Sequence, residues 1–82
     1  ESEDTLDKID TQNKIELLLK YLDTLSPREK DIIIKRYGLF NTKDMTQKEI
    51  AKKMNISRSY VSRLEKRAIT KILREFIKNK KI

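Results

Sequence analysis

The stretch TQKEIAKKMNISRSYVSRLEKR, residues 46–67, decides the fold of this chain. Thr46 and Glu49 have the spacing of a capping box, in which each side chain accepts a hydrogen bond from the backbone of the other residue. Asn55 falls where the chain must reverse, and asparagine tolerates the left-handed backbone conformation that ends a helix. Ser57 follows two residues later and is predicted to be the N-cap of a second helix. The spacing therefore predicts a helix-turn-helix.

The second helix of this motif has an apolar side and a basic side. Its apolar residues recur at steps of three or four and are Val61, Leu64, Ala68 and Ile72. Its polar side carries Ser59, Ser62, Arg63 and Lys66, with Arg58 at the flank near the start of the helix. Donors near the beginning of such a helix reach base edges when the helix lies in the major groove of DNA. We therefore interpret it as a recognition helix, which crosses the first helix at the small residue Ala51.

The composition fits one small, all-helical domain. The chain has 82 residues, of which 37% are hydrophobic, and it contains a single glycine and a single proline. It has no cysteine and no histidine, so it lacks the commonest metal ligands and the commonest general base. These absences argue against an enzyme, and we expect no metal or other cofactor.

The sequence shows no pattern of a membrane-spanning or exported segment. No apolar run approaches the roughly 20 residues that a membrane-spanning helix needs, and the start of the chain lacks a signal-peptide pattern. We therefore expect a cytoplasmic protein with no membrane partner. Because residue 1 is glutamate rather than methionine, we also expect the chain to be a part of a longer protein.

Charge is unevenly distributed along the chain. Residues 1–24 carry seven acidic and three basic side chains, a net charge of −4, whereas residues 25–82 carry six acidic and seventeen basic ones, a net charge of +11. The two parts give the net charge of +7 of the whole chain. Such asymmetry favours a polyanionic partner for the basic part, although a basic surface alone is also common on proteins that bind no nucleic acid.

The acidic part divides into a linker and a helix. Residues 1–10 are poor in apolar side chains, and we interpret them as a flexible acidic linker. Residues 11–24 are predicted to form an amphipathic helix with a buried apolar face. The apolar residues that repeat at helical spacing in it are Ile15, Leu18, Leu19 and Leu22.

A second capping box precedes the next helix. Ser26 and Glu29 have the required spacing, and Pro27 stands at the first helical position, where its missing N–H is not needed. Gly38 has the position of a left-handed C-cap, so a helix is predicted over residues 27–37. Its buried side consists of Ile32, Ile33, Ile34 and Tyr37.

The remaining segments complete an all-α domain over residues 11–82. Residues 39–45 are predicted to form a polar loop in which Leu39 and Phe40 pack as apolar anchors. The recognition helix is predicted to continue to about Lys78, and residues 79–82 are expected to fray. Its later apolar residues are Ile69, Ile72, Leu73, Phe76 and Ile77. The predicted fold is a four-helix domain of the winged-helix-like or helix-turn-helix class, with the motif at about 46–67 and a long recognition helix.

Two blocks of sequence together carry a family resemblance. They are LSPREKDIIIKRYGL, residues 25–39, and ISRSYVSRLEKRA, residues 56–68. The segment 25–76 that contains them resembles region 4, the C-terminal domain of bacterial sigma factors of the sigma-70 class. Within that class the segment is most similar to sporulation members of the mother-cell sigma-K type. The helix-turn-helix alone is shared with many repressors, whereas the two blocks at this spacing are specific to region 4.

The resemblance implies promoter recognition. Region 4 binds the −35 element as duplex DNA while attached to RNA polymerase, and it also holds the flap of the polymerase β subunit. The base-reading positions of the family fall here on Arg58, Ser59, Ser62 and Arg63. Its phosphate-contacting positions fall on Arg36, Thr46 and Arg67, with Lys66 nearby. Housekeeping members have longer charged residues at the positions of Ser59 and Ser62 and glutamine at that of Arg63, so the −35 sequence stays open.

Each proposed contact has a structural alternative. Arg58 and Arg63 can each balance Glu65 or bind phosphates instead of forking onto guanine. Arg36 can stabilise the end of its helix through the helix dipole. Ser59 and Ser62 can simply permit close approach. Tyr60 is expected to pack on the preceding helix rather than to touch DNA.

The apolar residues also have two possible roles. They are core residues by default, and some of them can line a groove for the β flap; the candidates are Ile15, Leu18, Leu22, Ile33 and Ile34.

Two other functions compete with a sigma factor domain. A free-standing repressor would have this fold but would need a dimer interface, and the little spare apolar surface favours a monomer. A protein-interaction module would use the basic helix to bind an acidic partner. Whether a regulatory or anti-sigma protein binds this surface is also left open.

Overall fold

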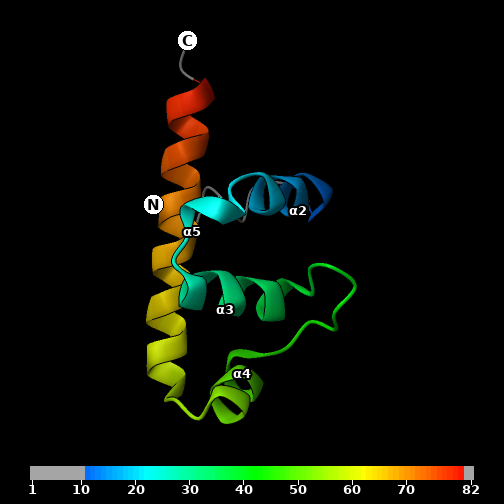
Figure 1. The fold of residues 1–82 in the computed structure, drawn as a ribbon, viewed down its shortest axis with the longest axis vertical. Helices are drawn as coiled ribbons and strands as arrows, with labels where there is room; N and C mark the ends of the chain where they lie inside the picture. The colour runs from blue at the N-terminus through cyan, green and yellow to red at the C-terminus, as the bar shows by residue number, and fades with distance from the viewer. Residues whose placement is uncertain (1–10, 81–82) are drawn as a thin grey trace.

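Three shorter α-helices pack along one long helix. The structure, a computed structural model, describes residues 11–80. The α-helices in this range are α2 (Thr11–Lys20), α3 (Pro27–Tyr37), α4 (Gln47–Met54) and α5 (Arg58–Lys80), with a short 3₁₀ helix η1 (Leu22–Thr24) after α2. Seen from the side, α5 forms a column along which α2, α3 and α4 follow one another (Figure 1). The described residues contain no strand, which confirms the all-α prediction. The predicted linker, residues 1–10, lies outside them.

The boundaries of α3 follow from its end residues. The backbone N–H of Glu29 donates to the Ser26 hydroxyl at 3.3 Å, and the N–H of Ser26 donates to the Glu29 carboxylate at 3.0 Å. Gly38 ends the helix with φ of +64°. A β-carbon at this position would come within 2.8 Å of the carbonyl oxygen of Thr42, so the loop that follows requires glycine. The predicted capping box and C-cap are confirmed.

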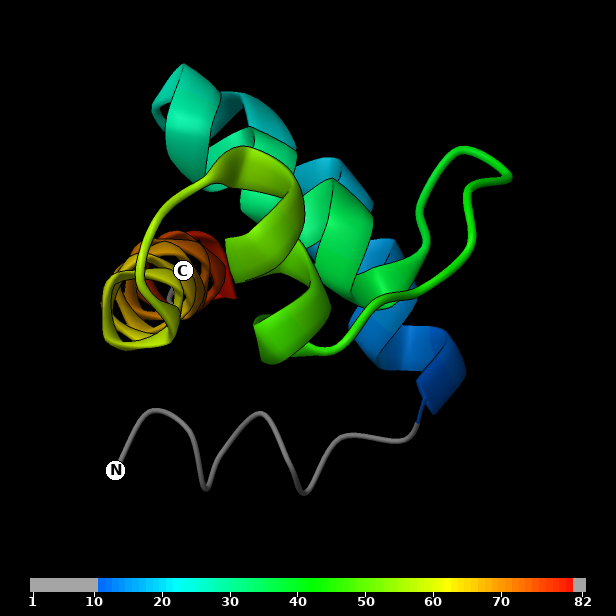
Figure 2. The ribbon, with the colours of Figure 1, turned by 90° about the horizontal axis from the view of Figure 1, so that it is seen from below.

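The helix-turn-helix is built in the same way. The N–H of Glu49 donates to the Thr46 hydroxyl at 3.1 Å, and the N–H of Thr46 donates to the Glu49 carboxylate at 2.8 Å. Asn55 adopts the left-handed conformation, with φ of +58°. The Ser57 hydroxyl accepts a hydrogen bond from the N–H of Tyr60 at 3.1 Å, which caps α5. Seen along α5, the chain crosses from α4 into α5 through a short turn (Figure 2).

Two apolar clusters lie along α5, and its predicted stripe contributes to both. The cluster nearer the turn joins α4 to α5 and contains Ile32, Ile50, Ala51, Val61 and Leu64. The other cluster joins α2 and α3 to the later turns of α5, where Ala68, Ile72 and Leu73 are buried. Each short helix is therefore held mainly by the long one.

Two predictions for the N-terminal helix were wrong. The α-helix ends at Lys20, and the chain tightens into η1 before it reverses toward α3. The Thr24 hydroxyl and its N–H both donate to the carbonyl of Tyr21, which stabilises this 3₁₀ turn. Leu17 is buried on α2 together with the predicted Leu18, whereas Leu19 is 42% exposed.

The loop and the C-terminal end also differ from the predictions. Leu39 is buried, but Phe40 is 65% exposed and has φ of +58°. Hydrogen bonds from Thr42 to the carbonyl of Leu39 fold the loop back and leave Phe40 at its surface. Ile77 is exposed as well. Asn79 is helical rather than frayed, and its amide donates to the hydroxyl of Tyr21 at 3.2 Å.

A buried ion pair fixes the start of α3 against α5. Glu29 is only 2% exposed and accepts a hydrogen bond from the Lys71 ammonium at 2.8 Å. Burial acts to raise the pKa of Glu29, but the hydrogen bond from Lys71, the backbone N–H of Ser26 and the positive charge of Lys71 together outweigh it. The pKa of Glu29 therefore lies below its usual range.

This pair makes stability depend on pH. Because the pKa of Glu29 is lower in the folded chain than in the unfolded one, its contribution is present above about pH 4.3 and is lost as the pH falls below the folded value. We expect Lys71→Met to lower the free energy of unfolding by about 1–3 kcal/mol at neutral pH, because it leaves a buried carboxylate without its partner. Urea unfolding measures this loss. The control is Lys78→Met on the exposed end of α5, and equal effects of the two substitutions would contradict the assignment.

Candidate nucleic-acid interface

The first two turns of α5 present the predicted base-reading residues on an accessible surface. Arg58, Ser59 and Arg63 are exposed and Ser62 is half-buried, whereas Val61 between them is fully buried. The apolar stripe holds the helix against the rest of the domain and directs its polar side outward. The helix is therefore free to enter a groove along the side that carries these residues.

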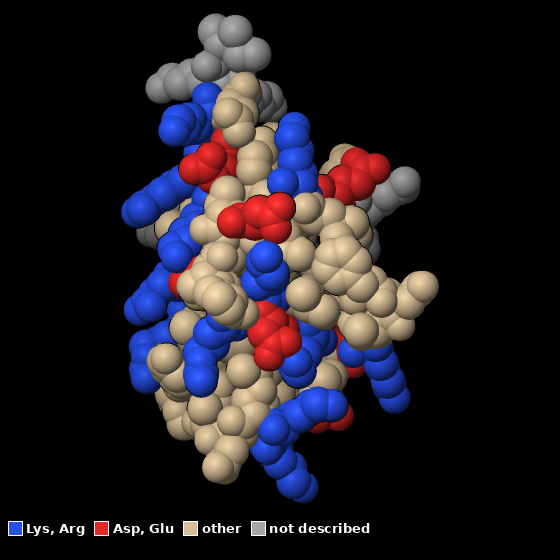
Figure 3. Space-filling view, viewed as in Figure 1, with Lys and Arg blue, Asp and Glu red and all other residues tan. Residues whose placement is uncertain are grey.

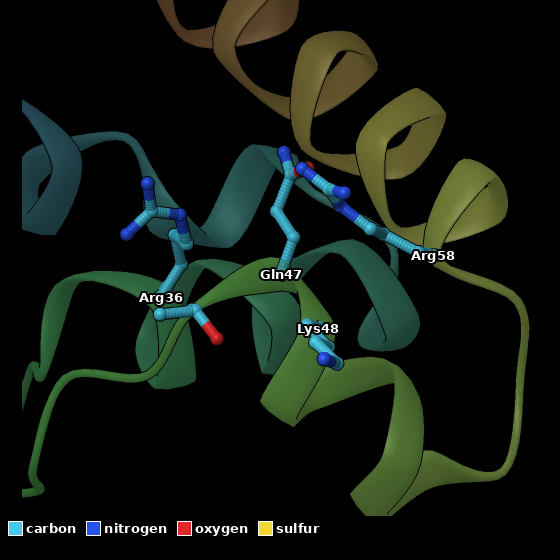
Figure 4. Close-up of a pocket in the computed structure, with 5 residues that line it drawn as sticks. Arg36, Gln47, Lys48 and Arg58 are labelled. Carbon is cyan, nitrogen blue, oxygen red and sulfur yellow. The ribbon is translucent and has the colours of Figure 1, made fainter.

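A polar hollow lies where the start of α4 meets the start of α5. One part of it is lined by Gln47, Arg58, Ser59 and Ser62. The adjoining part is lined by Arg36, Thr46, Gln47, Lys48 and Arg58. The side chains of Gln47 and Arg58 extend toward each other across it, and Arg36 lies at its other end (Figure 4). We call this surface the α4–α5 hollow.

The N-terminus of α4 gives the hollow the properties of an anion site. The N–H groups in the first turn of a helix have no intrahelical acceptor, and the helix dipole is positive at this end. The backbone and then the hydroxyl of Thr46, with the charge of Lys43, hold the pKa of Glu49 below its usual range, so the capping box stays intact at neutral pH. The N–H groups of Gln47 and Lys48 stand beside two arginine side chains, an arrangement that suits a phosphate.

Glu65 of α5 contacts two residues that line the α4–α5 hollow. Its side chain is 12% exposed, lies 3.5 Å from Nε of Arg36 and accepts a hydrogen bond from the Gln47 amide at 2.8 Å. Arg36 also donates to the carbonyl of Met45 at 3.4 Å. One carboxylate on α5 therefore links the end of α3 to the start of α4.

This network bears on two of the structural alternatives. Glu65 pairs with Arg36 rather than with Arg58 or Arg63, so neither of those two arginines serves to balance it. Arg36 does stand in the last turn of α3, but its guanidinium reaches across to Glu65 and lines the α4–α5 hollow.

The other predicted residues lie outside the hollow. Arg63 does not line the hollow, and its guanidinium carbon lies 5.7 Å from the centroid of the Tyr60 ring. Lys66 and Arg67 are exposed one turn further along α5. Tyr60 is half-buried and packs against the apolar cluster formed by residues of α3, α4 and α5.

The sequence analysis missed Gln47 and Lys48. Both belong to the first turn of α4, directly after the capping residue Thr46, and both line the hollow. Their place at a helix N-terminus that was predicted to face phosphate was the signal that could have identified them.

Positive charge gathers along α5. Figure 3 shows lysine and arginine side chains along the whole edge formed by α5 and around α4, whereas acidic side chains are few there. The local field therefore favours a polyanion along the edge formed by α5.

Comparison with known proteins gives this geometry a context. A family model described as sigma-70, region 4, matches residues 21–74. The chain belongs to this family. The region 4 domain is 51% identical over 81 residues to an RNA polymerase sigma-28 factor of Bacillus thuringiensis subsp. kurstaki, a match that covers 99% of this chain and 34% of that protein.

Other relatives agree. The domain is 48% identical over 81 residues to the RNA polymerase sigma-K factor of Bacillus subtilis (strain 168), with 99% of this chain and 28% of that protein covered. It is 49% identical over 63 residues to an RNA polymerase sigma-E factor of Clostridium acetobutylicum, with 77% of this chain and 27% of that protein covered. The region 4 domain thus spans about a third or less of the length of these relatives. No solved structure gave a significant match.

No helix among residues 11–80 combines the length and apolar character needed to cross a membrane.

The Glu65 network predicts a graded loss of stability. We expect Glu65→Ala to lower the free energy of unfolding by about 1–3 kcal/mol, because Gln47 loses its hydrogen-bond acceptor and Arg36 loses its ion-pair partner. Glu65→Gln keeps an acceptor oxygen and should cost less. The matched control is Glu75→Ala on the same helix, since Glu75 forms no ion pair within the described residues. Chemical denaturation of the three variants measures the order, and a loss for Glu75→Ala as large as that for Glu65→Ala would contradict it.

Proposed function

We propose that this chain is the promoter-reading domain of a sigma factor and that it binds the −35 element as duplex DNA. The observation that carries the proposal is the α4–α5 hollow, in which a helix N-terminus and three basic side chains adjoin the exposed start of the recognition helix. Membership of the region 4 family supports it.

Direct reading of bases is assigned to Arg58 and Arg63. Each can donate two parallel hydrogen bonds to O6 and N7 of guanine, and a good pair of this kind contributes about 1–3 kcal/mol of discrimination. Ser59 and Ser62 lie between them and permit close approach of the helix to the bases, while each adds a short donor. The two arginines project from different sides of α5, because one lines the hollow and the other lies over Tyr60.

Phosphate binding is assigned to residues around the reading surface. On the side of the hollow these are Arg36 and Thr46, joined by Gln47 and Lys48. Further along α5 they are Lys66 and Arg67. Contacts of this kind position the helix and carry no sequence information by themselves.

We also propose that the domain works as part of a sigma factor bound to core RNA polymerase in the cytoplasm. Its relatives are RNA polymerase sigma factors, and the similarity to the sigma-K factor supports a role at sporulation promoters. An interface of this size gives weak binding alone. Attachment to polymerase, which raises the effective concentration at the promoter, would then supply the affinity. We also propose a regulatory protein as a further partner of this surface and a monomeric state for the isolated domain.

We propose a location for the apolar contact with the β flap. Leu18, Leu22 and Ile33 are buried in the core, so they are not available to a partner. Leu19 and Phe40 are exposed on α2 and on the loop after α3, two elements that project to the same side of α5 (Figure 1). We assign the flap contact to these two side chains, because an apolar flap needs an apolar acceptor.

Selection of binding sites from random duplexes tests DNA recognition. We expect the wild-type domain to enrich one sequence, and Arg58→Ala to lose that preference because a base-reading fork is removed. Arg67→Ala should instead weaken binding to all duplexes and reduce the salt slope by about 0.9, the value for one phosphate contact. Enrichment of palindromic sites by a dimer would point to the repressor. Equal effects of both substitutions on selected and random DNA would contradict the division of roles.

Capture of the isolated β flap tests the polymerase contact. We expect Leu19→Asp and Phe40→Asp to lower retention of the flap at least tenfold, because each places a charge in an apolar interface. Ile77→Asp is the matched control, since it makes the same kind of change at an exposed position near the end of α5. Equal retention by all three variants would overturn this assignment, and failure of the wild-type domain to bind a flap that captures another sigma factor would overturn the proposed function.

A further inference from the structure

Gln47, the first residue of α4, lies beside Arg58, the first residue of the recognition helix. The two residues line both parts of the α4–α5 hollow. Figure 4 shows their side chains extended toward each other across it. A side chain of the first helix of the motif is therefore close to a side chain to which we assign base reading.

The amide of Gln47 has a defined orientation. Its nitrogen Nε2 donates a hydrogen bond to Oε1 of Glu65 at 2.8 Å. A carboxylate only accepts hydrogen bonds, so the part of the amide that meets it is the NH₂ group. The amide oxygen of Gln47 is then left for another partner, and that partner has to be a donor.

Glu65 is itself held in place, so it fixes the amide firmly. Its side chain is 12% exposed, and its Oε1 lies 3.5 Å from Nε of Arg36. Arg36 also donates to the carbonyl of Met45 at 3.4 Å, directly before the capping residue Thr46. The position of the Gln47 amide is thus set by contacts with α3 and α5 as well as by its own helix.

Arg58 needs a partner that holds it for base recognition. Its side chain is exposed and forms no ion pair with a carboxylate of residues 11–80. A long side chain loses rotamer entropy when it is fixed in one geometry, and two parallel hydrogen bonds to guanine require one geometry. A guanidinium has five N–H donors, of which this fork uses two. The remaining donors can bind an acceptor of the protein.

We propose that the amide oxygen of Gln47 accepts a hydrogen bond from Arg58, and that Gln47 is a positioning residue that holds the arginine fork for guanine. Gln47 then determines how strongly the domain prefers guanine at one base pair, although its side chain touches no base. The inference rests on the proposed function and deepens it, because it adds a side chain of α4 to those that set the sequence preference.

Affinities for duplexes that differ at one base pair test this role in the 82-residue chain. The base pair is the one at which Arg58→Ala loses its preference in site selection. Gln47→Met keeps the length of the side chain but removes the amide. We expect it to reduce the preference for guanine at this base pair about two- to tenfold, the effect of one hydrogen bond. Preferences at the other base pairs should stay as in the wild type.

Lys48→Met is the matched control, because it introduces the same side chain at the next residue of the same hollow. It removes a charge that we assign to phosphate binding. It should therefore weaken binding to all duplexes by the same factor, and the ratio of affinities that measures the preference for guanine should stay that of the wild type.

Two further measurements separate positioning from a purely structural role. Replacing the guanine by 7-deazaguanine, which lacks the N7 acceptor, should weaken binding of the wild type more than binding of Gln47→Met, because the fork of the variant is already poorly held. Gln47→Lys keeps a donor for Glu65 but offers no acceptor to Arg58, so it should lose the preference as Gln47→Met does. Urea unfolding checks that both variants are folded.

The outcomes separate this inference from the proposed function. Gln47→Met should have no further effect on the preference for guanine once Arg58→Ala is present, and additive effects would overturn the role of Gln47. A preference retained by Gln47→Met or Gln47→Lys, with Arg58→Ala still losing it, would do the same, as would an equal loss at every base pair. If the wild-type chain selects no duplex sequence at all, the proposed function itself fails.

Discussion

The apolar stripe of α5 is the constraint on which the rest of the structure depends. The helix runs for 23 residues, and the longest dimension of the domain, 42 Å, lies along it. The two clusters of buried side chains, one with Val61 and Leu64 and the other with Ala68 and Ile72, hold the three shorter helices against this single stripe. Because all of them pack on one side, the polar side of the first turns stays accessible. The same packing that stabilises the domain therefore exposes the surface that we assign to DNA.

Buried carboxylates set the short helices at defined places along α5. Glu29 pairs with Lys71 and so fixes the start of α3, and Glu65 joins Arg36 to Gln47 and so fixes the end of α3 and the start of α4. An apolar stripe alone would allow a helix to slide along it, since the hydrophobic effect has no direction. A carboxylate removed from water requires its own partners, because an unpaired buried charge is costly. These pairs therefore fix the positions of α3 and α4 along α5, which apolar burial alone would not do. As a result, the N-terminus of α4 lies next to Arg58.

The resulting surface suits binding of DNA in which charge attracts the duplex and a few base contacts provide sequence preference. Arg58 and Lys48 belong to the α4–α5 hollow, whereas Arg28 and Arg63 gather at Tyr60. Cations beside the first turns of α5 favour entry of the helix into a groove lined by phosphates. The side chains to which we assign base contacts are few, in keeping with the weak binding that we propose for the isolated domain. The chain spans about a third or less of the length of its relatives.

The sequence by itself determined most of the helix ends and the apolar stripe of α5, although it missed the 3₁₀ turn that follows α2. It predicted the capping boxes at Ser26 and Thr46, the left-handed ends at Gly38 and Asn55 and the stripe of α5, because each depends on residues a few positions apart. Only the tertiary structure determined which side chains of different helices are in contact. In that structure Arg36 is the partner of Glu65, and Leu19 and Phe40 are exposed. Gln47 lies close to Arg58, and Arg28 lies close to Tyr60. These contacts depend on the angles and distances at which helices cross, and those are fixed by side-chain packing between segments far apart in sequence.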